Sequence, residues 1–197
     1  YNKEKKTYNF SSMFGNVSNY IDDADIIMGT METGIADKEY SNIRAPKEFA
    51  QEVRKSGVNL VSIAHNHSLD SGVDGLKETK DNLEEIGFDV IGDKFDKANS
   101  VKIKKVKNTK IAFLAYTYFV DNQKKKEKEE LSCVNMYSEE QAKEDIKYAK
   151  ENDADYICVL MHWGDVMTEK ISEEQRKIAD FLVDNGVNMI LGSHPSV

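Results

Sequence analysis

Short apolar runs alternate with amphipathic segments along most of the chain. The apolar runs are rich in Val, Ile and aromatic residues, which is typical of buried β-strands. Residues 101–106 instead alternate Val and Ile with Lys, so we expect a strand with one exposed face there. The full set of expected strands covers residues 24–28, 59–64, 88–91, 101–106, 110–120, 156–161 and 188–191.

Helical patterns fill the segments between these runs. They predict helices over residues 46–55, 70–86, 138–151 and 172–185. The last two both begin with Ser-Glu-Glu-Gln, the spacing of a capping box. Alternating strands and helices predict an α/β fold built in layers. A length of 197 residues suits one domain, so we expect a single domain over residues 1–197.

The charge balance excludes some classes of partner. Asp and Glu total 35 against 27 for Lys and Arg, which gives a net charge of -8. Non-specific nucleic-acid binding depends on an excess of Lys and Arg, so we expect no nucleic-acid partner. The longest apolar run, residues 111–120, is too short to span a membrane as a helix. The mixed-charge run 124–130 is expected to be an exposed loop or helix end.

All four histidines of the chain come at the ends of predicted strands. His65 and His67 follow one strand, His162 follows a second and His194 follows a third. Open α/β sheets bind ligands at the carboxyl ends of their strands, so we expect these side chains at one sheet edge. Converging imidazoles and carboxylates are usual ligands of zinc and other transition metals. The carboxylates expected at the same edge are Glu32, Asp70 and Asp165.

A single histidine at a strand end is more often a hydrogen-bonded residue than a metal ligand. The chain has no histidine anywhere else, and this coincidence favours a polar functional site over that alternative. The pattern by itself identifies neither the metal nor the reaction.

Four local sequences carry a more specific signal. They are Thr30-Met31-Glu32, His65-Asn66-His67-Ser68-Leu69-Asp70-Ser71-Gly72, His162-Trp163-Gly164 and Gly192-Ser193-His194-Pro195-Ser196. In this order they resemble the motifs of the CapA/PgsA family of bacterial capsule and poly-γ-glutamate biosynthesis proteins. That family usually reads Asn-Leu-Glu, Asn-Asn-His-x-x-Asp-x-Gly, His-Trp-Gly and Gly-Ser-His-Pro-His at these places. The resemblance covers nearly the whole chain.

The resemblance implies a fold and a set of site residues. The family looks like a branch of the calcineurin-like metallophosphoesterases, which have two β-sheets flanked by helices and generally bind two divalent metals. By position, Glu32 would be the carboxylate that bridges the metals. Asn66, His162 and His194 would complete the ligands of the second metal, and His67 would be the general acid.

The departures from the family pattern affect the first metal. The family's Gly-Asp motif is absent, although residues 1–14 resemble the stretch that follows it, and Ser196 replaces the last family histidine. We therefore expect at most one divalent ion, of manganese, zinc, iron or magnesium, in a chain that is either part of a longer protein or has a degenerate first site. His65 is expected to form hydrogen bonds, with metal ligation as the alternative. Asp70, Asp165 and Ser196 are expected around the ligands rather than among them.

Two functions remain open from the sequence. The first is a metal-dependent hydrolase of a phosphoester or an amide, in which His67 protonates the leaving atom. The second is a non-catalytic component of a complex that assembles a capsular polymer, with poly-γ-glutamate implied by the resemblance. The resemblance also implies an extracytoplasmic protein, anchored in the cell membrane by a segment absent from this sequence. A net charge of -8 would repel a polyanion, so binding it would need local basic groups or a metal.

Overall fold

The computed structural model describes residues 8–15, 24–36, 44–96 and 100–196, so the first seven residues of the stretch 1–14 lie outside it. The chain divides into two compact units. Unit 1 contains Tyr1–Ile63 and His67–Val90, and unit 2 contains Ala64–Asn66 and Ile91–Val197. A single domain over the whole chain stays a prediction.

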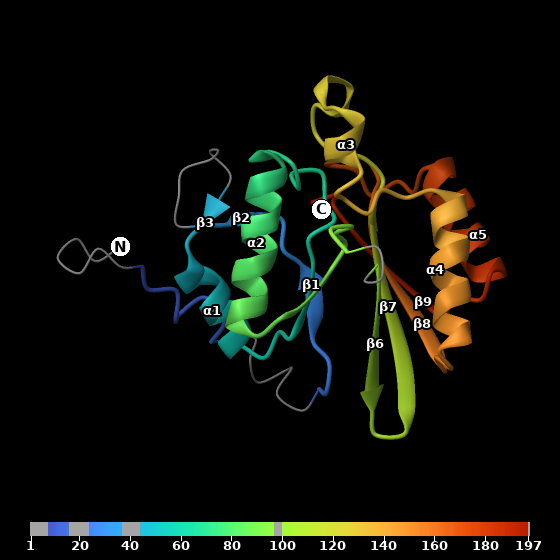
Figure 1. Cartoon of the computed structure of the whole chain (residues 1–197), viewed down its shortest axis with the longest axis horizontal. Coiled ribbons are helices and arrows are strands. Elements are labelled where there is room, and N and C mark those ends of the chain that lie inside the picture. Colours follow the sequence, from blue (N-terminus) through green and yellow to red (C-terminus); the bar gives the residue numbers. More distant parts are fainter. Residues whose placement is uncertain (1–7, 16–23, 37–43, 97–99, 197) are drawn as a thin grey trace. The chain divides into compact units, whose positions relative to one another are not determined.

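Unit 1 contains a three-stranded sheet and two helices. The sheet has the strand order β1-β4-β5, with β1 at Met28–Thr30, β4 at Leu60–Ser62 and β5 at Asp89–Ile91. β1 and β4 are parallel. A parallel pair is formed by β2 (Gly34–Ile35) and β3 (Arg44–Ala45). Helices α1 (Lys47–Lys55) and α2 (Gly72–Ile86) pack side by side in this unit (Figure 1).

Helix α2 holds strand β2 through two buried polar side chains. Thr79 Oγ1 accepts a hydrogen bond from the Ile35 backbone N–H at 3.1 Å, and Asn82 Nδ2 donates to the Ile35 carbonyl at 2.7 Å. Both side chains interrupt the apolar face of α2, which also buries Leu76 and Leu83. Buried polar side chains need hydrogen-bond partners, and the backbone N–H and carbonyl of Ile35 in β2 supply them.

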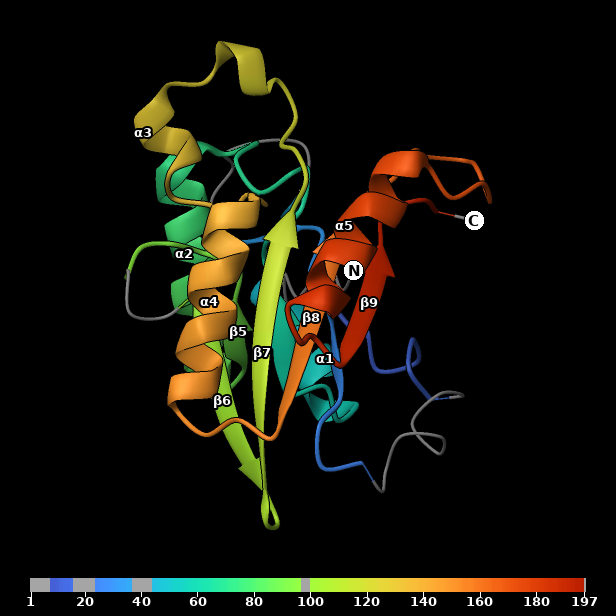
Figure 2. The same ribbon diagram turned by 90° about the vertical axis from the view of Figure 1, so that its right-hand side faces the viewer.

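Unit 2 contains a four-stranded sheet in the order β6-β7-β8-β9. β6 (Val101–Val106) is antiparallel to β7 (Thr109–Thr117), and β7, β8 (Tyr156–His162) and β9 (Met189–Ser193) run parallel. Helices α4 (Glu139–Glu151) and α5 (Glu173–Asp184) connect the parallel strands and cover one face of the sheet (Figure 2). The short helices η2 (Gln123–Lys125) and α3 (Lys128–Leu131) follow β7.

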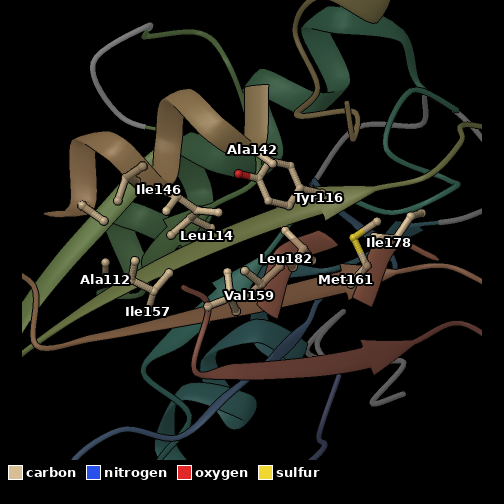
Figure 3. Close-up of a cluster of buried hydrophobic side chains, with 13 residues drawn as sticks. Ala112, Leu114, Tyr116, Ala142, Ile146, Ile157, Val159, Met161, Ile178 and Leu182 are labelled. Atoms are coloured by element: carbon tan, nitrogen blue, oxygen red, sulfur yellow. The ribbon is translucent and has the colours of Figure 1, made fainter. Parts of the chain in front are cut away.

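The core of unit 2 lies between that face of the sheet and the two helices. Alternate residues of β7 and β8 point toward apolar side chains on α4 and α5, as expected for a strand period of two and a helix period of 3.6. Figure 3 shows this cluster, which includes Ala112, Leu114, Tyr116, Ile157, Val159, Met161, Ala142, Ile146, Ile178 and Leu182.

The predicted α/β class, with several sheets flanked by helices, is confirmed. The resemblance implied two sheets, and the described residues form a four-stranded sheet, a three-stranded sheet and the β2–β3 pair. The mixed-charge run 124–130 is largely exposed and forms short helices with loops between them, as expected. Helix α5 has the complete predicted capping box between Ser172 and Gln175. In α4 only half of that box forms, because Gln141 Oε1 accepts from Lys94 Nζ instead of from the Ser138 backbone N–H.

The expectation of a single sheet edge for all four histidines is wrong. His65 and His67 follow β4 of the three-stranded sheet, whereas His162 and His194 lie at the ends of β8 and β9 in the four-stranded sheet. A sequence pattern identifies strands but not which strands pair, and here the histidines follow strands of two different sheets. Among the described residues, no helix combines the length and the apolar character needed to cross a bilayer.

Candidate metal centre

The best-defined contact of the site joins His162 and Asn66, both in unit 2. His162 is the last residue of β8, and its ring is buried, with 1% of the residue exposed. Its Nε2 lies 3.0 Å from Asn66 Oδ1, and its Nδ1 lies 3.1 Å from Ser193 Oγ at the end of β9. An amide oxygen only accepts, so Nε2 carries the proton and Nδ1 accepts from the Ser193 hydroxyl. Two polar neighbours therefore fix the ring.

Asn66 is held in turn by Asp121. The Asn66 Nδ2 group donates to Asp121 Oδ1 at 3.2 Å, and the Asp121 backbone N–H donates to the Asn66 carbonyl at 2.7 Å. These two bonds fix both the backbone and the amide orientation, and they turn Oδ1 toward His162. Asp121 thus stabilises the orientation of a side chain that the sequence assigns to a metal.

Two further imidazoles lie next to His162. The ring centroid of His194 is 4.7 Å from that of His162, and the centroid of His65 is 6.1 Å away on an edge-to-face approach. His65 is buried, whereas His194 is half-buried and packs edge-on against Phe119 at 5.3 Å. Unit 2 therefore brings together Asn66, His162 and His194 of the predicted ligand set, with His65 beside them.

The backbone at His194 has a conformation that side chains with a Cβ rarely adopt. Its φ is 107°, and Ser196 follows with a φ of 57°. Positive φ at a non-glycine residue costs free energy and is concentrated at functional sites. The Ser196 hydroxyl donates to the His194 carbonyl at 3.0 Å, which supports this turn.

The other residues predicted for the site are not part of the Asn66, His162 and His194 cluster. Glu32 is exposed in the loop after β1, in unit 1. His67 also belongs to unit 1, and its Nδ1 lies 2.9 Å from Asp70 Oδ2. Asp165 is exposed in the loop after β8. The roles assigned to these residues stay predictions.

The family of the chain follows from a match over its whole length. Residues 1–197 match the model of a family described as "Bacterial capsule synthesis protein PGA_cap". The chain belongs to the PGA_cap family. This confirms the family that the four sequence motifs indicated.

Curated relatives of this PGA_cap chain carry related names. It is 26% identical to "Capsule biosynthesis protein CapA" of Bacillus anthracis, over 96% of this chain and 49% of that protein. It is 27% identical to "PGA biosynthesis protein CapA" of Bacillus subtilis (strain 168), over 88% of this chain and 48% of that protein. The chain thus spans about half the length of these relatives.

Among solved structures, the sulfate thiohydrolase SoxB of Thermus thermophilus in complex with glycerol is similar to this chain at 15% sequence identity. The match covers 74% of this chain and 26% of that one, with a TM-score of 0.49.

The donor set in unit 2 fits a divalent ion. In octahedral coordination, two neighbouring ligand atoms that bind one ion at about 2.1 Å are about 3.0 Å apart. The 3.0 Å between His162 Nε2 and Asn66 Oδ1 equals that separation, so an ion could replace the proton that they share. Two imidazoles and an amide oxygen suit borderline ions such as zinc or manganese.

Sequence reasoning missed two residues of this centre. Asp121 follows the predicted strand 110–120, so the rule that singled out the histidines would also have found it. Ser193 was named only as part of the Gly192–Ser196 motif, with no role of its own, whereas its hydroxyl orients the His162 ring. Its role depends on the register of β8 and β9, which sets His162 opposite Ser193 and is not visible in the sequence.

Proposed function

We propose that this PGA_cap chain binds one divalent ion through Asn66, His162 and His194 and acts in the production of a capsular polymer at the cell envelope. The observation that supports it best is the 3.0 Å contact between His162 Nε2 and Asn66 Oδ1, with the His194 ring beside it. The capsule assignment is supported by the family match and by the names of both curated relatives. Poly-γ-glutamate is the polymer that the sequence resemblance implies.

Glu32 completes the proposed ligand set as its only carboxylate. That assignment rests on the Thr30-Met31-Glu32 motif alone. A neutral site of two imidazoles and one amide would bind a divalent ion weakly, and one carboxylate strengthens it. With Ser196 in the place of a family histidine, we expect one ion rather than two.

The proposed reaction is hydrolysis of a phosphoester or an amide. A bound divalent ion supplies Lewis-acid polarisation of the scissile group. His67 would give a proton to the leaving atom. Asp70 accepts from His67 Nδ1 at 2.9 Å, which holds the ring and leaves Nε2 to carry the mobile proton.

The alternative function is a non-catalytic part of the polymer-synthesis complex. The incomplete first-metal motif favours it, because two-metal catalysis stabilises the attacking and leaving oxygens together. In either case we propose an extracytoplasmic location, with a membrane anchor elsewhere in the full-length protein.

Metal content and hydrolysis distinguish the two functions. The chain is stripped with chelator, reloaded with manganese or zinc, and analysed for bound metal and for cleavage of bis(p-nitrophenyl) phosphate and γ-glutamyl-p-nitroanilide. The hydrolase predicts slow, metal-dependent cleavage that His67→Gln lowers by about 100-fold, while His65→Ala has little effect. A chain that retains no metal at pH 7 would support the assembly role instead.

A further inference from the structure

A pocket of about 340 Å³ opens in unit 2 beside His194. It is formed by the loops after β7 and β8 and by the first turns of α5. Of its lining residues, the functions proposed above use His194 alone. The lining residues on which its chemistry depends are Tyr118, Phe119, Trp163, Asp165, Glu174 and Gln175.

The charged groups of this lining are mainly acidic. Among the described residues that line it, Asp165 and Glu174 are the carboxylates, His194 is the one imidazole, and there is no Lys or Arg. Such a lining opposes an anionic ligand and favours a cationic one.

Two backbone N–H groups at the start of α5 have partners within the helix itself. Free backbone N–H groups at a helix start normally attract anions. Here Ser172 Oγ accepts from the Gln175 N–H at 3.1 Å, and Gln175 Oε1 accepts from the Ser172 N–H at 2.8 Å. The capping box satisfies both of these donors internally, which leaves fewer N–H groups to attract an anion.

Three aromatic side chains accompany the carboxylates. The neighbouring Glu174 carboxylate raises the pKa of the Tyr118 hydroxyl. Trp163 packs against Gly192 so closely that a Cβ at that position would lie 2.7 Å from its Nε1. Phe119 packs on His194. Aromatic faces combined with a carboxylate are the surroundings that bind an organic ammonium group.

We propose that this pocket binds the ammonium group of a primary amine. Glu174 supplies the main opposite charge, Asp165 adds to it, and the aromatic side chains of Tyr118 and Trp163 contact the carbon atoms next to the nitrogen. A volume of about 340 Å³ accommodates an amine with a short carbon chain. Glu174, Asp165, Tyr118 and Trp163 are not in the proposed metal ligand set, although His194 of that set also lines the pocket, so the titrations are made on the metal-free chain.

The chain has a single tryptophan, which lines the pocket, so its fluorescence reports binding directly. The probes are n-butylammonium, n-butanol and butyrate, which have similar size and different charge, each titrated at constant chloride concentration. We expect butylammonium to change the tryptophan fluorescence saturably. Butanol should bind at least fivefold more weakly, and butyrate should not bind. Amide chemical shifts of residues 163–166 in the same titrations provide a second readout that does not depend on fluorescence.

Two variants test the role of the carboxylate. Glu174→Gln should weaken butylammonium binding at least fivefold, and Glu173→Gln is the matched control, because Glu173 precedes it on the same helix and does not line the pocket. The proposal would be overturned if the three probes bound equally, or if neither readout changed saturably. It would also be overturned if the two variants lost butylammonium affinity equally.

Discussion

His162 Nε2 and Asn66 Oδ1 lie 3.0 Å apart, although 96 positions separate the two residues in the sequence. Each is held by a second partner, Ser193 for the imidazole and Asp121 for the amide. The two potential ligand atoms are therefore directed at the same point before any ion binds. Preorganisation of this kind lowers the free-energy cost of binding a metal.

Asp121→Ala should weaken metal binding without unfolding the chain. The substitution removes the acceptor of Asn66 Nδ2, so the amide can rotate and Oδ1 no longer points steadily at His162. Loss of such an outer partner typically lowers metal affinity by about 10- to 100-fold. Calorimetric titration with zinc measures the effect. Asp184→Ala, which removes an exposed carboxylate on α5, is the control; equal affinity in the two variants would contradict the role given to Asp121.

His194→Gly should be more stable than His194→Ala, by about 1 kcal/mol, although both lose the imidazole. The reason is the φ of 107° at this residue, which glycine adopts without strain and alanine does not. Urea denaturation of the two variants measures the difference. If the alanine variant were equally or more stable, the strained backbone at His194 would be disproved.

Asp145→Ala should destabilise unit 2 by about 3 kcal/mol. Asp145 is buried and accepts hydrogen bonds from Ser100 Oγ at 2.7 Å, Tyr116 OH at 2.7 Å and Gln141 Nε2 at 2.9 Å. Truncation leaves these three donors without their acceptor in the core. Glu144→Ala on the exposed face of the same helix should change stability by less than about 0.5 kcal/mol in the same thermal and urea measurements. Similar losses for the two variants would contradict this account.

The chain should lose stability as the pH rises from 9 toward 12. Burial raises the pKa of the Cys158 thiol from 9.0 to about 11 and that of the Tyr137 hydroxyl from 10.0 to about 12. Between each pair of values the unfolded chain releases a proton that the folded chain keeps, so alkali favours unfolding. The stabilising contribution is complete below pH 9 and is lost through this window. Urea denaturation at several pH values measures the slope.

Cys158→Ala tests the thiol part of that pH dependence. The variant should be less stable at pH 7, because it loses buried side-chain volume, but its stability should fall less steeply between pH 9 and 11. The difference in slope should approach one proton, or about 1.4 kcal/mol per pH unit. Identical slopes in the two proteins would show that Cys158 does not contribute.

The sequence predicted the elements of the fold better than their ends. Strand β6 was predicted at its observed bounds, and the Ser138 and Ser172 side chains cap α4 and α5 as their spacing indicated. The first strand was predicted at residues 24–28 but begins at Met28. Before it, Ile27 bonds to the Asn59 side chain as well as to the backbone, and this side-chain partner is invisible to an apolar pattern.

The motifs also placed Asn66, His162 and His194 in one ligand set, whose role as a metal site stays a prediction. Asn66, His162 and His194 were chosen from motifs, and the structure brings these three together. Asp121 and Ser193 were missed as their supports, because their roles depend on where loops and strands meet in space. Strand pairing is a long-range property, so the two separate sheets could not be read from hydrophobic periodicity.

The most direct test of the proposed metal centre is calorimetric titration of the unmodified chain with manganese and with zinc at pH 7, repeated on His162→Ala, His194→Ala and His65→Ala. We predict one weakly bound equivalent, its loss in the first two variants and its retention in the third. Two tightly bound equivalents, or binding that survives His162→Ala, would contradict the assignment.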